Sequence, residues 1–577
     1  MTPSTTARRA ALEGRHATWV PRTISGHFDH AAAQFPDRPY LMTADRIYSY
    51  AEIREWSRTI ASGLIARGIA PGDHVAMALA NLPEFVAIKL AISRVGAVAV
   101  PINYNLRRNE LAYILDQSKA RALFVMDQLR DIDYLTELDA MVPGWESAAG
   151  GGVLPELAHV FVIATAGGEP ARGTGIKALT QSRTAGSDVV LSAREAVGDP
   201  HFRSDVIYTS GTTGRPKGSM CTHDMVARIA YASAYTRAFD DGRRIIFALP
   251  LYHVFGYVEC MIATTFVGGA IIPHVAFDAE RMLAETERFR ATEWVGVPLM
   301  TMAMLDLLKN RTFDLSSLVA VFNSGGLSPA WIWGQIRTAF GVDEICTAYG
   351  MTETTASTTC VMPEDPDERL QNSHGRMKLG GVAGDPSLGG ALAEYRVVEP
   401  DTGQDVTSGE PGELICRGPV VTLGYYNKPE ETAEAFTADG WFRTGDIGRI
   451  DADGYLTLTG RLKESYRCNG EMVMPKEIED LLNEHPLVAT SYVVGIPHEK
   501  MGEVGCVCVV PAGRTRVDPE ELIELCRANL ARFKVPRHVV FVTADEIPMT
   551  ATGRPQKFKL IELAKTRLAE LPPDSVR

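Results

Sequence analysis

The chain has 577 residues, of which 45% are hydrophobic and 22% are charged, a composition typical of globular proteins with more than one domain. Its net charge of −13 disfavours nucleic acid and anionic membrane surfaces as partners. Nine scattered cysteines without a CxxC pair do not make a disulfide framework and suit the reducing cytoplasm, where we expect the protein.

The N-terminal stretch over residues 1–19 has no apolar segment of the kind found in a secretory signal. It is short of acids and carries Arg8, Arg9 and Arg15, which gives it a weak similarity to a transit peptide. We expect a disordered tail there, because such short polar termini are rarely ordered.

Apolar runs of strand length alternate with amphipathic helical stretches from about residue 40 to residue 350, which predicts mainly parallel sheets covered by helices. The longest apolar run, 254–273, is interrupted by Glu259, glycines and a proline. We therefore expect a buried α/β segment there and no membrane span. The predicted strands are 74–80, 205–210, 244–250 and 318–326, with a helix over 279–291.

From about residue 390 to 460, short strands separated by Gly, Pro and Asp predict a compact β element. Beyond Gly460 the pattern predicts an α+β unit of about 100 residues, large enough to fold alone. Cys506 and Cys508 lie on one face of a strand in it and are predicted core residues. The expected fold is α/β: a large N-terminal domain of helix-covered sheets plus a β element over 1–462, then a small mobile α+β domain over 463–577.

A dense loop of Ser, Thr and Gly follows the predicted strand at 205–210 and precedes a helix. Its hydroxyls, its unobstructed backbone N–H groups and the charge of Lys217 can cradle a polyphosphate. It is not a Walker A loop, because the Gly-x4-Gly-Lys-Ser/Thr pattern cannot be laid on it. A plain flexible loop is the alternative. The loop residues are Thr209, Ser210, Gly211, Thr212, Thr213 and Gly214.

This loop, written YTSGTTGRPKG, resembles the signature of the adenylate-forming superfamily, which includes acyl-CoA synthetases, adenylation domains of peptide synthetases and beetle luciferases. The forms PLYHVFG and NGEMVMPKEIE are most similar to fatty acyl-CoA synthetases. The resemblance implies two steps, in which a carboxylate attacks the α-phosphorus of ATP and a thiol, here that of CoA, then displaces AMP. The small C-terminal domain would rotate between them. Matching motifs follow in the family's order at 249–256, 323–326, 349–353, 440–446 and 460–479.

By this resemblance, one set of residues would bind the nucleotide. The phosphate loop and Lys217 would hold the β- and γ-phosphates, Thr352 the α-phosphate, and Glu353 a Mg²⁺ ion, which prefers carboxylate and phosphate oxygens. Tyr349 would stack on adenine. Asp446 would accept hydrogen bonds from the ribose, although a turn residue is the alternative reading. The remaining nucleotide contacts are assigned to Gly325, Gly326, Gly350 and Arg461.

Three further positions are assigned to acyl transfer and domain rotation. His253 would lie where the acyl and pantetheine channels meet, although an isolated His after a strand is often structural. Lys463 matches the hinge. Gly470 would line the pantetheine tunnel, where a side chain would block the thiol. The family often has Gly-Gly where this chain has Asn469-Gly470.

The last motif departs from the family pattern. A lysine follows the glycine in most members, where this chain has Arg554 and then Pro555. Arginine is a planar fork and lysine a compact point charge, so the two are not equivalent. Proline removes a backbone N–H and restricts the preceding residue. We therefore expect adenylation to be weak or lost, with thioester formation from an acyl-adenylate retained; the alternative is that Arg554 does the lysine's work.

This combination resembles acyl-CoA ligases of bacterial secondary metabolism, including the non-adenylating type of platensimycin and platencin biosynthesis, which acts on adenylates of bulky diterpenoid acids. It implies ATP or AMP, CoA and Mg²⁺ as cofactors, an acid or its adenylate as substrate, and a separate adenylating enzyme as partner. Three alternatives stay open: a complete ATP-dependent medium- or long-chain fatty acyl-CoA synthetase, an adenylation enzyme that loads a carrier protein, and a nucleotide-binding protein without turnover. A non-catalytic binder would not need the hinge and tunnel residues.

Overall fold

The computed structural model of the chain describes residues 3–148, 150–209, 216–325, 328–468, 471–498, 501–513, 518–550 and 555–570, with only the backbone of residues 148 and 471. These residues pack into two compact units. The large unit comprises Met1–Glu394 and Arg417–Gly440, and the small unit comprises Tyr395–Cys416 and Trp441–Arg577. The predicted boundary at residues 462 and 463 marks the expected limit of domain rotation and stays a prediction.

The first sheet of the large unit has seven strands in the order β16-β15-β14-β12-β13-β1-β2, parallel except for the β1–β2 pair. Its central strands are buried at every residue except Arg244, the first residue of β12, as expected for a parallel sheet covered on both faces. The strands are β1 (Pro39–Met42), β2 (Ile47–Ser49), β12 (Arg244–Phe247), β13 (Ala270–Pro273), β14 (Glu293–Gly296), β15 (Ala320–Asn323) and β16 (Glu344–Cys346).

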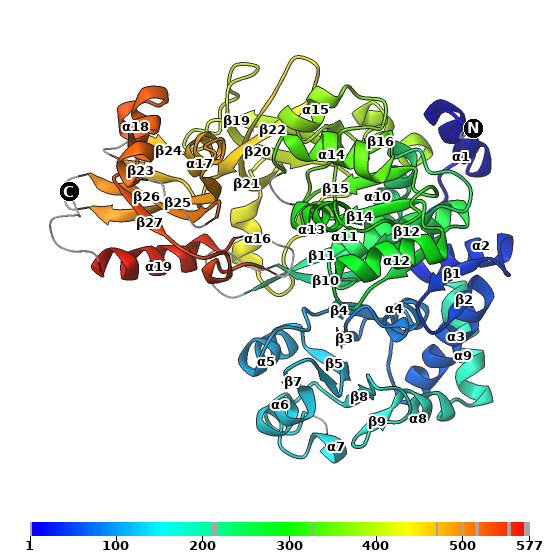
Figure 1. The fold of residues 1–577 in the computed structure, drawn as a ribbon. Coiled ribbons are helices and arrows are strands. Elements are labelled where there is room, and N and C mark those ends of the chain that lie inside the picture. The colour runs from blue at the N-terminus through cyan, green and yellow to red at the C-terminus, as the bar shows by residue number, and fades with distance from the viewer. Residues whose placement is uncertain are drawn as a thin grey trace. The chain divides into compact units, whose positions relative to one another are not determined.

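Helices α12 (Ala279–Phe289), α13 (Pro298–Leu308) and α14 (Trp331–Phe340) lie side by side against this sheet (Figure 1). The predicted helix over 279–291 is confirmed by α12. Further helices of the large unit are α1 (Thr5–Arg15), α2 (Ile24–Gln34), α3 (Tyr50–Ala66), α4 (Pro83–Val95), α5 (Arg108–Gln117), α6 (Tyr134–Met141), α7 (Trp145–Ala148), α8 (Ile176–Gln181), α9 (Ala185–Ala196), α10 (His223–Thr236), α15 (Asp367–Asn372) and α16 (Pro429–Ala435).

The second sheet also has seven strands, in the order β11-β10-β4-β3-β5-β8-β9, and is parallel except for the β10–β11 pair. The predicted parallel α/β architecture is therefore confirmed. The strands are β3 (His74–Ala78), β4 (Val98–Pro101), β5 (Ala120–Met126), β8 (His159–Ile163), β9 (Thr174–Gly175), β10 (Arg203–Thr209) and β11 (Lys217–Thr222), and two short hairpins are β6 (Gln128–Leu129) with β7 (Ile132–Asp133) and β17 (Thr359–Cys360) with β18 (Arg376–Met377).

The long apolar run forms the buried segment that the sequence predicts. It begins with the short helix α11 (Val254–Gly256), continues as a π-helix over Tyr257–Ile262 and a 3-10 helix over Ala263–Val267, and ends in β13. Glu259 lies inside the π-helix with 1% of its surface exposed. Within the described ranges, no helix combines the length and the apolar character needed to cross a membrane.

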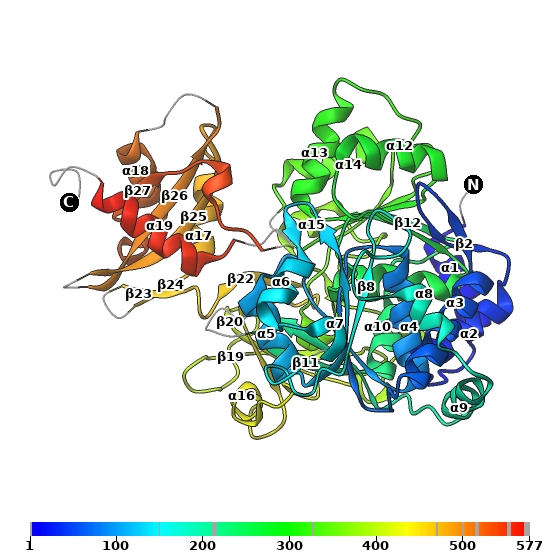
Figure 2. The same ribbon diagram turned by 90° about the horizontal axis from the view of Figure 1, so that it is seen from below.

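The small unit contains the predicted β element and the predicted α+β element. Helices α17 and α19 pack against β25, and α18 packs against β27 (Figure 2). One sheet is β19 (Glu394–Val398), β20 (Gly412–Arg417), β21 (Phe442–Ile450) and β22 (Leu456–Arg461); the other elements are β23 (Tyr466–Cys468), β24 (Glu471–Val473), β25 (Val488–His498), β26 (Gly502–Pro511), β27 (His538–Phe541), α17 (Pro475–Asn483), α18 (Pro519–Asn529) and α19 (Lys557–Ala569).

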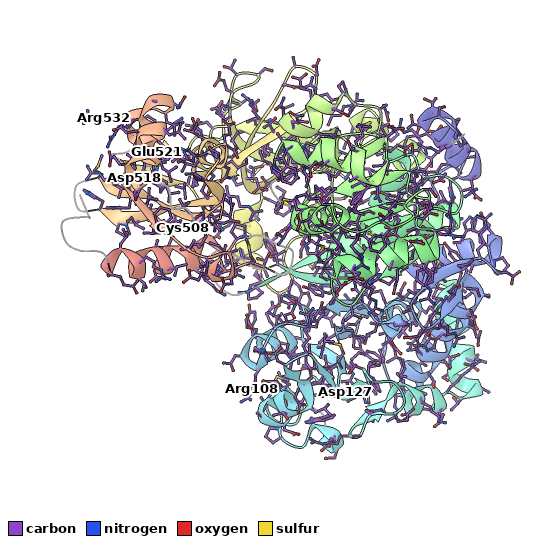
Figure 3. The ribbon with its side chains drawn as sticks, viewed as in Figure 1. Arg108, Asp127, Cys508, Asp518, Glu521 and Arg532 are labelled. Carbon is purple, nitrogen blue, oxygen red and sulfur yellow. The ribbon has the colours of Figure 1, made fainter. Side chains whose placement is uncertain are left out.

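Cys506 and Cys508 lie in the core of this second element, as predicted. Cys508 is fully buried, whereas Asp518, Glu521 and Arg532 are exposed at the surface (Figure 3). All nine cysteines of the chain are buried.

The expectation of a disordered N-terminal tail is wrong. Residues 5–15 form α1, whose first turn is capped by the Ser4 hydroxyl. Arg8 is buried and forms an ion pair with Glu344 at the start of β16. Arg9 binds Glu364 at 2.6 Å, and Arg15 binds Asp241. The arginines are therefore anchors whose partners are distant in sequence, which composition alone could not reveal.

Replacing Arg8 with Ala should destabilise the protein, because it leaves the largely buried Glu344 carboxylate without its nearest partner. We expect a loss of about 3 kcal/mol in the free energy of unfolding. Arg46→Ala is the matched control, since the Arg46–Glu52 pair is exposed and should contribute less than about 1 kcal/mol. Urea denaturation measures both variants, and equal losses would contradict the anchoring role of α1.

Candidate functional site

Strands β10 and β11 bring the two ends of the phosphate loop together. Thr209 pairs in register with Lys217, and its hydroxyl donates to the Lys217 carbonyl at 3.4 Å. The antiparallel ladder between the two strands therefore holds Thr209 beside Lys217. The predicted phosphate-binding residues Ser210, Gly211, Thr212, Thr213 and Gly214 lie outside the described residues.

Tyr425 lies between two predicted phosphate-site residues. The ammonium of Lys217 is 4.9 Å from the centre of the Tyr425 ring, and the Tyr425 hydroxyl donates to Glu353 Oε1 at 3.0 Å. Burial, together with the Glu353 charge, raises the pKa of Tyr425 far above its usual value. The phenol therefore stays protonated and acts as the donor of this hydrogen bond. Tyr425 could not be found from the sequence, where its only signal is an aromatic pair after Gly424.

The remaining large-unit nucleotide candidates gather on one tight turn. Tyr349 is buried, and its carbonyl accepts from the N–H groups of Thr358 and Thr359 at 3.0 and 3.2 Å. Gly350 pairs with Ser357, so the chain folds back within seven residues. A Cβ at Gly350 would lie 2.2 Å from the Ala356 carbonyl oxygen, so only glycine fits there.

Thr352 and Glu353 lie within this turn, in a short 3-10 helix, and both are buried. The Ser324 hydroxyl donates to the Ala348 carbonyl at 2.7 Å and thereby links the turn to the end of β15, where Gly325 follows. The turn therefore brings together four predicted residues, Tyr349, Gly350, Thr352 and Glu353, with Gly325 on the neighbouring strand end. Gly326 lies outside the described residues.

His253 begins α11, and its Nδ1 accepts a hydrogen bond from the Phe255 backbone N–H at 3.2 Å. This bond fixes the orientation of the imidazole ring. Gly325 has a φ of +86°, and a Cβ built on it would lie 3.6 Å from the Phe255 ring and 3.3 Å from Val297. The His253 segment and the end of β15 are therefore neighbours.

In the small unit, Asp446 on β21 pairs in register with Arg461 on β22. Arg461 Nε lies 2.9 Å from Asp446 Oδ1, and Asp446 is 2% exposed. Lys463 lies in the turn just after β22. Gly470 and Arg554 fall outside the described residues, whereas Pro555 pairs with Met549 across their loop.

The metal prediction depends on Glu353. Across the described ranges, no cluster of three or more His, Cys, Asp or Glu side chains is arranged to hold a metal ion. Magnesium is usually held by one or two carboxylates together with substrate phosphates. A single buried carboxylate, bonded to Tyr425 on which Lys217 lies, fits an ion that arrives with a nucleotide.

The chain is similar to known proteins over nearly its whole length. Residues 28–426 match the family of AMP-binding enzymes, and residues 477–554 match the AMP-binding enzyme C-terminal domain. The putative acyl-CoA synthetase YngI of Bacillus subtilis is 35% identical over 95% of this chain and 98% of its own length. The 3-(7a-methyl-1,5-dioxo-octahydro-1H-inden-4-yl)propanoyl:CoA ligase of Mycobacterium tuberculosis is 34% identical over 94% of this chain and 99% of its own.

Among solved structures, the anthranilate CoA ligase AuaEII in complex with anthranoyl-AMP superposes with a TM-score of 0.80 at 25% identity, covering 96% of this chain and 100% of its own. The two family matches lie in the order that the sequence motifs predict, and the similarity extends over nearly the whole chain. The chain therefore belongs to the AMP-binding enzymes of the adenylate-forming superfamily, and it is an acid–thiol ligase of the acyl-CoA synthetase type.

Proposed function

We propose that this protein forms an acyl-CoA thioester from an acyl-adenylate and CoA with release of AMP, and that its own adenylation step is weak. The observation that carries the proposal is Arg554-Pro555 at the place of the family's lysine and apolar residue. In family members that have it, this lysine would neutralise the negative charge between the substrate carboxylate and the α-phosphate of ATP during adenylation. A guanidinium has a different reach, and a misplacement of about 1 Å can cost on the order of 10²-fold in rate.

The described flanks of this loop support the proposal. Pro555 pairs with Met549 but offers no N–H to that pairing, and the Gln556 N–H donates instead to the Pro548 carbonyl at 2.7 Å. Lys557, the lysine that follows closest in sequence, binds Glu479 Oε1 at 2.6 Å and is largely buried. Because Lys557 is already paired with Glu479 inside the small unit, it is a poor substitute for the lysine that the family has at position 554.

In the proposed transfer, the CoA sulfur attacks the carbonyl carbon of the acyl-adenylate. The C–S bond forms as the C–O bond to AMP breaks, AMP leaves with the electron pair, and the thiol proton passes to solvent. We assign the α-phosphate contact to Thr352 and the ribose contact to Asp446. His253 would flank the acyl carbonyl, and Gly470 would leave the thiol's path open. Magnesium, held by Glu353, would neutralise phosphate charge when bound.

We propose a bulky polycyclic carboxylic acid as the acyl group. The name of the M. tuberculosis relative specifies a fused-ring propanoyl group, and that relative aligns over nearly the whole chain. The diterpenoid acid of an antibiotic pathway, expected from the sequence, is one member of this class. A separate enzyme would then supply the adenylate. The cytoplasm is the proposed location, because nine free cysteines without a disulfide framework suit a reducing compartment.

A complete acyl-CoA synthetase is the competing candidate. It is favoured by the full-length similarity to proteins named as synthetases and ligases. One experiment distinguishes the two functions. The protein is given either fused-ring acids with ATP or the preformed acyl-adenylates, each with CoA and Mg²⁺, and the formation of pyrophosphate and acyl-CoA is measured. Acyl-CoA from the adenylates alone supports the proposal, and rapid acid-dependent pyrophosphate release would establish the complete synthetase.

Arg554→Lys should restore adenylation, because it returns a compact ammonium to this loop. We expect pyrophosphate release to rise about tenfold or more. Adding Pro555→Ile should raise it further and more than additively, since neighbours in one loop couple. Acyl-CoA formation from supplied adenylate should change less than about twofold in Arg554→Lys, in Pro555→Ile and in the double variant. If both activities rose together, the two half-reactions would share this loop and the proposal would fail.

Gly470→Trp should abolish acyl-CoA formation, because an indole would fill the proposed thiol path. AMP binding, measured by calorimetry, should change less than about twofold, since the tunnel does not carry the nucleotide. A CoA-dependent rate equal to that of the wild type would show that Gly470 does not line the tunnel.

Tyr425→Phe should weaken the binding of Mg·ATP, because it removes the hydroxyl that orients Glu353. Hydrogen bonds to charged groups contribute about 1.5–3 kcal/mol, so we expect a loss of about tenfold or more in affinity. The neighbouring Tyr426→Phe is the matched control and should bind Mg·ATP as the wild type does. Calorimetric titration measures the Mg·ATP affinity of both variants. If Tyr425→Phe bound Mg·ATP as tightly as Tyr426→Phe does, Tyr425 would not belong to the site.

A further inference from the structure

Glu259 is a buried carboxylate in an otherwise apolar segment. It lies in the π-helix Tyr257–Ile262, shortly after His253, and π-helical turns occur frequently at functional sites. Lys378 Nζ approaches its two carboxylate oxygens at 2.9 and 3.0 Å, and both side chains are 1% exposed. The Ser233 hydroxyl also donates to this carboxylate.

The same carboxylate holds the far end of the Tyr349 turn. The Ser357 N–H donates to Glu259 Oε1 at 3.1 Å, and the Ser357 hydroxyl donates to the same oxygen. Ser357 in turn pairs with Gly350 at the near end of the turn. The Lys378 N–H donates to the Thr358 carbonyl at 2.9 Å, so both members of the ion pair bind the returning strand of the turn.

A second cation balances the charge of this cluster. Arg237 donates to the backbone carbonyl of Glu259 and to the Glu293 carboxylate, and its guanidinium lies 4.6 Å from the Phe322 ring centre. Burial alone would raise the pKa of Glu259, but Lys378 and Arg237 outweigh it and lower this pKa, so the carboxylate stays ionised. A buried ion pair is costly in desolvation, and apolar residues of similar size would often stabilise the fold as well.

We propose that Glu259, together with Lys378, is a positioning residue that joins the segment carrying His253 to the turn carrying Thr352 and Glu353. The inference rests on the roles given to those residues in the proposed function. In that function, His253 lies beside the acyl carbonyl and Thr352 contacts the α-phosphate, so the two segments flank the bond that breaks. A fixed link between them would keep this bond aligned with the attacking thiol.

The test compares AMP with adenosine, because adenosine lacks the phosphate that Thr352 would contact. Calorimetry gives the dissociation constant of each ligand for the wild type, Glu259→Gln and Ser357→Ala. We expect AMP affinity to fall about tenfold in Glu259→Gln and less in Ser357→Ala, as found when supporting partners of a site are removed. Adenosine affinity should change less than about twofold, so the ratio of the two affinities reports the position of the turn.

Arg94→Met is the matched control, since the buried Arg94 guanidinium forms an ion pair elsewhere in the same unit, with the partly exposed Asp29 at 2.6 Å. It should lower the melting temperature without changing the ratio of AMP to adenosine affinity. If Glu259→Gln does not fold, Ser357→Ala alone tests the inference, because it removes only the hydroxyl that donates to Glu259. An unchanged ratio in the folded variants, or an equal change in the control, would overturn the inference. A wild type that binds no AMP would overturn the proposed function, and this inference with it.

Discussion

The backbone pairing of Gly350 with Ser357 is the constraint on which the large-unit part of the site depends. It closes a turn so tight that a Cβ at Gly350 would overlap the Ala356 carbonyl. Thr352 and Glu353 thereby lie on one short element that follows β16, in a turn that the Ser324–Ala348 hydrogen bond links to the end of β15. In open α/β sheets, ligands bind in the loops just outside the carboxyl ends of the parallel strands.

The protein must bind anionic ligands although its own net charge is negative. The chain carries a net charge of −13, yet the proposed ligands are anions. Lys217 lies over the Tyr425 ring, next to the Tyr425–Glu353 hydrogen bond, so its charge is close to the phosphate loop. Elsewhere in the large unit, several cations are buried in pairs with carboxylates, as with Lys89 and Asp205 and with Lys378 and Glu259. Paired charges contribute little field at a distance, so local cations decide where an anion binds.

The chemistry explains how one half-reaction could weaken while the other persists. Adenylation needs a cation that reaches two anionic groups at once, which is a strict geometric demand. Thioester formation starts from an adenylate that is already activated, so it needs a clear path for the thiol and a bound nucleotide. In our proposal, the Arg554-Pro555 pair bears on the first demand alone, whereas His253 and Thr352, which we assign to the second, lie within the AMP-binding family match.

The sequence by itself determined the fold class, the order of the motifs and most strand positions, because buried parallel strands and turn residues have strong local signals. It identified the residues of the Tyr349 turn by their motif. It failed for α1, whose arginines look like a polar tail until their partners at Glu344 and Glu364 are known. It also missed Tyr425 and gave Glu259 no role beyond interrupting an apolar run. These residues act through contacts with partners about 70 to 360 positions away, and only the tertiary structure decides which distant side chains meet.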